Sequence, residues 1–289
     1  MTDLANRTAI ITGASQGLGV AIAEHFLAEG ASVALCARNA DELEAQRKRL
    51  ADTHGADRVL AMVADISIRG EVDALFAAVQ SRFERLDILV CNAGVHGPMG
   101  SIETIDWDKW VQAIAINLTG SVYCARKAVA AFKPHRYGKI LMLSGGGATS
   151  PLPGISAYAA SKAAIVRFAE TLALEVKEWN IDVNAIAPGA MVTRLTDEMI
   201  DAGPERVGAA LHVRMTKLKQ DGGSPLKLAA AMCSYLASRD SDGLTGRLIS
   251  APWDPWPFSP EQRQEIAESD IYALRRIVPG DRGKTWGDR

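Results

Sequence analysis

The sequence predicts an α/β protein in which a doubly wound parallel sheet of about seven strands is covered by helices on both faces. Two observations predict it. Apolar strand-like runs alternate with periodic segments of helix length from the start of the chain, and glycines close several of those segments. A chain of 289 residues with 48% hydrophobic residues can also bury a large core. We expect a single domain over residues 1–252 and a C-terminal extension over residues 253–289.

The expected strands and helices alternate regularly. The strands are the apolar runs near residues 7–12, 32–36, 58–63, 86–91, 138–143, 181–187 and 245–250. The helices are the periodic segments near residues 17–29, 40–53, 69–84, 106–132, 157–178 and 226–238. Residues 190–225 have no strand partner, so we expect an excursion over the sheet edge that lines a substrate site.

Composition excludes several classes of partner. The formal net charge is -2 and the basic residues are dispersed, which argues against nucleic acid. No apolar run is long enough to cross a bilayer and no signal peptide is evident, so we expect a cytoplasmic protein without a membrane partner. Neither the histidines nor the cysteines have metal-ligand spacing, and no metal is expected. The four cysteines, expected to be reduced thiols, are Cys36, Cys91, Cys124 and Cys233.

A glycine-rich turn, T-G-A-S-Q-G-L-G, follows the first expected strand. Gly13, Gly17 and Gly19 precede a helix, and glycines at such a turn let the backbone approach a phosphate at the helix N-terminus. The spacing differs from G-x-G-x-x-G, and a merely tight turn is the alternative.

Polar or small residues also end the next strands of the expected sheet. Asp65 and Ile66 end the third, and Asn92, Ala93 and Gly94 end the fourth. Ligands of open α/β sheets bind along this edge. Helix capping by Asp65 and a turn at Asn92 are the alternatives.

Arg38 follows the second expected strand, where no carboxylate is present. An arginine attracts the 2′-phosphate of NADP(H), whereas a carboxylate would bind the ribose of NAD(H) and repel that phosphate. NADP(H) is therefore favoured, with NAD(H) as the alternative. A solvated turn arginine is the competing interpretation, because Gln16 supplies no second positive charge.

Tyr158 and Lys162 lie four residues apart on one face of an expected helix. A free phenol has a pKa of about 10, and a nearby ammonium lowers that value by stabilising the phenolate. Tyr158 could then exchange a proton with a carbonyl or alcohol oxygen. Ordinary surface packing of the pair is the alternative.

Five motifs in order, T-G-A-S-Q-G-L-G, C-N-A-G, I-N-L-T-G, Y-A-A-S-K and A-P-G-A-M-V-T, resemble the short-chain dehydrogenase/reductase family in its compact single-domain branch. The resemblance covers roughly residues 5–250. It implies a Rossmann-like sheet, hydride transfer with NAD(P)(H), a small-molecule carbonyl or secondary alcohol as substrate, and a homodimer or homotetramer.

The resemblance also implies roles for individual residues. Tyr158 would be the acid/base, Lys162 would hold ribose hydroxyls and lower the tyrosine pKa, and Asn117 would help to keep a water. Thr193 would contact the nicotinamide carboxamide. The full set of implied nucleotide-binding residues is Gly13, Ser15, Gln16, Gly17, Leu18, Gly19, Arg38, Asp65, Ile66, Asn92, Ala93, Gly94, Lys162, Pro188, Gly189 and Thr193.

The catalytic serine of the family departs from this pattern. It usually lies thirteen residues before the tyrosine, where this chain has Gly145. Ser144 is the favoured replacement; Thr149 or Ser150 is a second candidate, and the absence of any side-chain donor is a third. The alternative function is therefore a cofactor-binding regulatory or scaffold protein that lost efficient turnover.

The C-terminal extension is rich in aromatic residues. Trp253, Trp256 and Phe258 are expected to pack on their own domain or on a neighbouring subunit, and a substrate-pocket wall is the alternative. A short helix is expected from Ser259, because a capping serine, a following proline and Gln262 form the pattern of a helix start.

Overall fold

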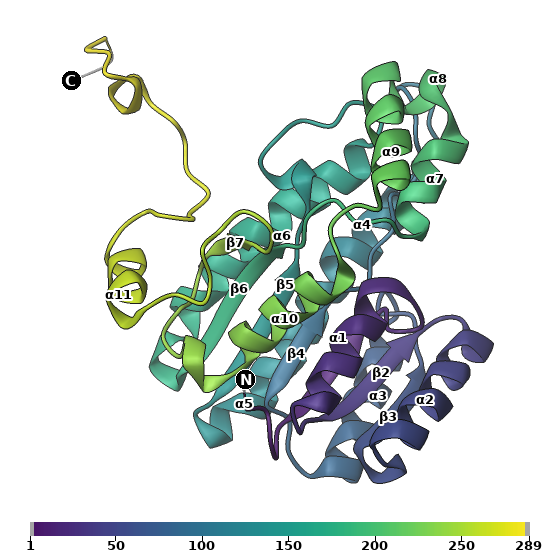
Figure 1. Ribbon diagram of the computed structural model, residues 1–289, viewed down its shortest axis with the longest axis vertical. Helices are drawn as coiled ribbons and strands as arrows, with labels where there is room; N and C mark the ends of the chain where they lie inside the picture. The colour runs from purple at the N-terminus through teal and green to yellow at the C-terminus, as the bar shows by residue number, and fades with distance from the viewer. Residues whose placement is uncertain (1–2, 287–289) are drawn as a thin grey trace.

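The computed structural model describes residues 3–286, which contain a seven-stranded sheet (Figure 1). Its strand order is β3-β2-β1-β4-β5-β6-β7, and every neighbouring pair is parallel. The strands are β1 (Thr8–Thr12), β2 (Ser32–Ala37), β3 (Val59–Val63), β4 (Ile88–Cys91), β5 (Gly138–Leu143), β6 (Ile181–Ala187) and β7 (Leu248–Ser250). The expected fold class and strands are confirmed, and the strand order reverses between β1 and β4, where such sheets bind ligands.

Helices cover both faces of the sheet. They are α1 (Gly17–Ala28), α2 (Ala40–His54), α3 (Arg69–Phe83), α4 (Trp107–Ile114), α5 (Ser121–Phe132), α6 (Ser156–Glu175), α7 (Arg194–Ala202), α8 (Pro204–Val207), α9 (Ala209–Asp221), α10 (Leu226–Ala237) and α11 (Pro260–Glu268). Buried residues of α1, α2 and α10 form one apolar cluster, and those of α3, α5 and α6 form the other. Ile11 and its neighbour Ile10 belong to opposite clusters, because successive side chains of a strand point to opposite faces. Two-sided burial explains why the strands are continuously apolar.

The single helix expected over residues 106–132 is interrupted. A π-helical turn, Ala115–Gly120, separates α4 from α5. The Asn117 side chain at this turn hydrogen-bonds with the backbone of Val95, and a Cβ on Gly120 would lie 2.6 Å from the Ile66 carbonyl oxygen. The irregular turn therefore brings the helix close to the ends of two strands, and such turns are frequent at functional sites.

The excursion expected over residues 190–225 folds into α7, α8 and α9, which stand together at one end of the molecule (Figure 1). An antiparallel bridge between Met191 and Gly223 closes its base. The excursion therefore begins and ends beside the carboxyl edge of the sheet.

The C-terminal extension runs across the body and then away from it (Figure 1). Trp256 stacks on Tyr235, and Phe258 is buried in the cluster that contains α1 and α10. Trp253 is 84% exposed. The expected helix start is confirmed, because the Ser259 hydroxyl accepts a hydrogen bond from the Gln262 backbone N–H.

Two further properties follow from the packing. No helix within residues 3–286 is both long enough and apolar enough to span a membrane. All four cysteines are buried free thiols, and burial raises the pKa of Cys36 and of Cys91 to about 12.

Candidate active site

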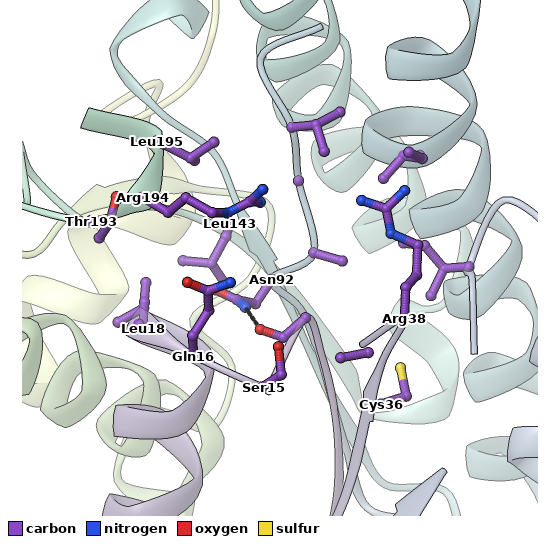
Figure 2. Close-up of a pocket in the computed structure, with 18 of the residues that line it drawn as sticks. Ser15, Gln16, Leu18, Cys36, Arg38, Asn92, Leu143, Thr193, Arg194 and Leu195 are labelled. Carbon is purple, nitrogen blue, oxygen red and sulfur yellow. Dashed lines mark hydrogen bonds between the residues drawn. The ribbon is translucent and has the colours of Figure 1, made fainter. Parts of the chain in front are cut away.

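A cavity of about 380 Å³ opens at the carboxyl edge of the sheet, where the strand order reverses (Figure 2). The structure brings together most residues that the sequence singled out. Those that line the cavity are Gly13, Ser15, Gln16, Gly17, Leu18, Arg38, Asp65, Ile66, Asn92, Ala93, Gly94, Ser144, Tyr158, Lys162, Pro188 and Thr193. Gly19, Asn117 and Gly189 are absent from this lining.

The glycine-rich turn is shaped by close backbone contacts. Gly13 has a φ of +66°, and a Cβ there would lie 2.7 Å from Cα of Ala93. A Cβ on Gly19 would lie 2.4 Å from the Gly13 carbonyl oxygen. Gln16 precedes α1 without a side-chain cap, so the first N–H groups of α1 are left for a ligand. This turn can hold a phosphate.

Asn92 locks the ends of β1 and β4 together. Its Nδ2 donates to the carbonyl oxygens of Thr12 at 2.9 Å and Gly13 at 3.0 Å. The Thr12 hydroxyl oxygen accepts hydrogen bonds from the backbone N–H groups of Asn92 and Ala93. The amide side chain of Asn92 therefore holds the start of the glycine-rich turn in place.

Arg38 lies at one side of the cavity and Arg194 at the other (Figure 2). The Arg38 side chain is 51% exposed, and its Nη1 is 3.8 Å from Oδ2 of Asp65. Sequence reasoning missed Glu42, whose Oε2 accepts a hydrogen bond from the Ser15 hydroxyl at 3.1 Å. Glu42 lies only four residues after Arg38, near the start of α2, and this closeness in the sequence could have identified it.

Lys162, on α6, is buried at the wall of the cavity. Its Nζ donates to the Leu143 carbonyl oxygen at 2.7 Å and lies 5.6 Å from the centre of the Tyr158 ring. Burial lowers the pKa of Lys162 to about 8. With a pKa of about 8, Lys162 is mainly an ammonium at neutral pH, and its neutral amine form is also accessible.

Tyr158 does not have the lowered pKa that the sequence predicted. Burial raises the pKa of Tyr158 to about 12. Within residues 3–286 its hydroxyl has no hydrogen-bond partner, and the Lys162 ammonium is bonded to Leu143 instead. The protein by itself therefore keeps the phenol protonated at neutral pH.

Asn117 positions the loop that follows β4. Its Oδ1 accepts from the backbone N–H of Val95 at 2.8 Å, and its Nδ2 donates to the Val95 carbonyl oxygen at 2.8 Å and to the Ser161 hydroxyl at 3.0 Å. These contacts use both N–H groups of the amide, and the role of Asn117 in keeping a water stays a prediction.

No hydroxyl of the loop after β5 forms a hydrogen bond with Tyr158. Ser144 is 3% exposed, and its hydroxyl donates to the Lys162 carbonyl oxygen at 3.2 Å. Thr149 and Ser150 are exposed and do not line the cavity. A Cβ on Gly145, in contrast, would lie 2.5 Å from the Tyr158 hydroxyl oxygen. The phenol therefore occupies space that a serine side chain at residue 145 would need.

We predict that Gly145→Ser lowers kcat by about tenfold or more, because an added Cβ displaces the phenol and such overpacking costs about 1–3 kcal/mol. Gly146→Ser is the matched control, since a Cβ on Gly146 meets nothing within 4 Å. Steady-state kinetics of both variants test this. An increase in kcat for Gly145→Ser would show that the missing hydroxyl limits the reaction.

The excursion lines one side of the cavity. Of its lining residues, the sequence predicted only Thr193. Thr193, the N-cap residue of α7, lines the cavity as expected. Met191, Arg194 and Leu195 also line it. Arg194 directly follows the last motif in the sequence and forms an ion pair with Glu198, in which Nη1 is 3.0 Å from Oε1.

Comparison with known proteins agrees with this geometry. Residues 7–202 match the family model described as short chain dehydrogenase. The chain is 36% identical over 248 residues to 3beta-hydroxysteroid dehydrogenase 1 of Eggerthella lenta, covering 86% of this chain and 92% of the relative. It is 35% identical over 246 residues to a glucose 1-dehydrogenase of Gluconobacter oxydans, covering 85% and 90%.

The fold also matches solved structures. Levodione reductase superposes with a TM-score of 0.78 and 28% sequence identity, covering 85% of this chain and 96% of that one. The matching model spans more than half of the chain, and the relatives are matched over nearly their whole length. The chain therefore belongs to the short-chain dehydrogenase/reductase family and is an NAD(P)-dependent oxidoreductase.

Proposed function

We propose that this chain is an NADP(H)-dependent oxidoreductase that interconverts a carbonyl and a secondary alcohol of a small molecule, with Tyr158 as the acid/base. The observation that carries the cofactor choice is Arg38. Its half-exposed guanidinium lines the cavity beyond β2 and is only loosely paired with Asp65. It is therefore available to a phosphate, for which a guanidinium is a strong partner.

The residues of the cavity fit a dinucleotide along its length. The glycine-rich turn and the N-terminus of α1 suit the diphosphate. Lys162 and Thr193 both line the cavity; Lys162 would hold ribose hydroxyls, and Thr193 would meet the carboxamide. A bound nicotinamide nucleotide supplies or accepts the hydride in this family's reaction.

The protonation of Tyr158 suits proton donation. A phenol with a pKa of about 12 carries its proton at neutral pH and can give it to a carbonyl oxygen as hydride arrives at the carbon. The Lys162 ammonium, 5.6 Å from the ring centre, then stabilises the phenolate that forms. These properties support carbonyl reduction as the favoured direction.

We expect Arg38→Gln to raise the Kd for NADPH by about 10- to 100-fold, because a charge-assisted hydrogen bond contributes about 1.5–3 kcal/mol. The Kd for NADH is expected to change by less than about threefold, which makes it the internal control. Fluorescence titration with both nucleotides, followed by turnover against a panel of aldehydes and ketones, tests the proposal. A wild-type preference for NADH, or no nucleotide oxidation with any carbonyl, would overturn it.

Three expectations stay predictions. A homodimer or homotetramer would pair through the long helices, and exposed Trp107 on α4 and Leu174 on α6 supply apolar surface for it. The second is the division of the chain into a domain over residues 1–252 and an extension over residues 253–289, and the third is the cytoplasmic location. The mass of the purified protein in solution tests the first.

A further inference from the structure

His96 is a buried polar residue that the proposed chemistry does not use. It is 3% exposed, and its ring meets the Tyr158 ring edge-on, with centroids 5.0 Å apart and planes at 62°. The backbone next to His96, at Gly97, is tightly packed. A Cβ on Gly97 would lie 2.7 Å from Cβ of Ala113 and 3.3 Å from Cβ of Ala157, so the backbone is pressed between α4 and α6.

The other side of the His96 ring faces α7. Its Nδ1 is buried and lies 3.4 Å from Oε2 of Glu198, without a hydrogen bond of good geometry. The other oxygen of Glu198 pairs with Arg194, which lines the nucleotide cavity. A continuous series of contacts therefore joins Tyr158, His96, Glu198 and Arg194.

This series connects two parts of the site that lie on separate elements. Tyr158 belongs to α6, which packs on the sheet, whereas Glu198 and Arg194 belong to the excursion that covers the cavity. The close contact with His96 and the charge of the nearby Arg194 hold the pKa of Glu198 below its ordinary value, so this residue is a carboxylate at neutral pH. A charged, oriented carboxylate can hold the imidazole in one position.

The loop after β5 gives the Tyr158 hydroxyl no side-chain partner. Gly145 provides no side chain, and the Ser144 hydroxyl is bonded to the backbone of α6. The His96 ring packs directly against the phenol ring. Holding an acid/base within a fraction of an ångström of its working position has large effects on rate.

We propose that His96 is a positioning residue for Tyr158, and that Glu198 holds it in place so that the phenol is fixed when α7 lies over the nucleotide. The proposal rests on the proposed role of Tyr158 as the acid/base. His96 acts through the tyrosine ring and not on the reacting atoms. The α7 segment thereby takes part in catalysis as well as in covering the cavity.

The test is a set of single variants and one double variant. His96→Ala is expected to lower kcat by about tenfold, with the Kd for NADPH changed by less than about twofold and the substrate KM changed little. His96→Phe keeps an aromatic edge on Tyr158 and loses the Glu198 contact, so it should recover part of that loss. Glu198→Gln should lower kcat to a similar extent as His96→Phe, and the double variant His96→Phe, Glu198→Gln should be no slower than the slower single variant.

Controls separate this proposal from a structural role and from the proposed function. Glu205→Gln changes an exposed acid on α8 and should leave kcat unchanged. Because Glu198 is partly exposed, Glu198→Gln should fold normally. It therefore tests the proposal even if the His96 variants unfold. Unchanged kcat in His96→Ala and Glu198→Gln, multiplicative losses in the double variant, or losses confined to KM would overturn the inference. If Tyr158→Phe turns over normally, the proposed function fails instead.

Discussion

Tyr158→Phe is expected to lower kcat by about 10²- to 10⁴-fold while the Kd for NADPH stays within about twofold. The phenol hydroxyl has no hydrogen-bond partner within residues 3–286, so its removal breaks no contact of the folded protein. It does remove the proton that the carbonyl oxygen needs, and general acid catalysis contributes about that factor. Single-turnover oxidation of NADPH and a nucleotide titration measure the two quantities.

The same variant distinguishes the two functions that the sequence left open. Under the scaffold alternative, which rests on Gly145 in place of the usual serine, there is no Tyr158-dependent turnover to lose. A wild-type rate that is slow and equal to that of Tyr158→Phe would therefore favour a cofactor-binding protein without efficient catalysis. The phenylalanine variant should unfold at the same temperature as the wild type in either case.

The sequence predicted the parts of the site that local chemistry determines. The glycine-rich turn, Asn92 and the pair Tyr158 and Lys162 all lie within short motifs whose structure follows from neighbouring residues. All of them reach the cavity or its wall. Their mutual placement follows from the parallel sheet, because successive strands bring their carboxyl ends to one edge.

The parts it missed depend on packing between distant segments. His96 and Glu198 are about a hundred residues apart in the chain, and nothing in either segment indicates that they meet. The pKa of Tyr158 was expected to fall because a lysine is near, but burial outweighs a cation that is bonded elsewhere. Neither the depth of burial nor the direction of a side chain can be derived from spacing alone.

The replacement for the missing serine illustrates a third limit. Ser144 was favoured because a run of glycines could let it swing into the cavity. In the structure its hydroxyl bonds to the Lys162 carbonyl oxygen, and the Tyr158 hydroxyl lies 2.5 Å from where a Cβ on Gly145 would be. Ser144 lines the cavity, but the partner of its hydroxyl is set by the packing of α6 on β5, which motif alignment does not reveal.

Lys162→Met is expected to raise the free energy of unfolding at pH 7 by about 1–3 kcal/mol while lowering kcat. Burial lowers the pKa of Lys162 from 10.5 to about 8, so the folded protein binds this proton less tightly than the unfolded chain does. Each unit of such a difference corresponds to about 1.4 kcal/mol. Loss of the hydrogen bond to Leu143 offsets about 1 kcal/mol of the gain.

The stability difference between Lys162→Met and the wild type is expected to depend on pH. The destabilisation caused by Lys162 is fully present below about pH 8 and disappears as the pH rises toward 10.5, because there the unfolded chain also loses the proton. The stability advantage of Lys162→Met should therefore shrink over that interval. Urea unfolding at pH 7, 8, 9 and 10 measures it.

Lys139 is the matched control, because it is a second buried lysine with the opposite electrostatics. Its Nζ lies 2.7 Å from Oδ2 of Asp182 and 2.7 Å from Oδ1 of Asp242. Burial alone would lower the pKa of Lys139, but the two carboxylates outweigh it and hold the pKa above its ordinary value. Lys139→Met leaves Asp182 buried without its cationic partner, so it should destabilise the protein by about 3–5 kcal/mol at pH 7. If both methionine variants lose stability equally and independently of pH, the lowered pKa of Lys162 is wrong, and the ammonium that supports Tyr158 costs the fold nothing.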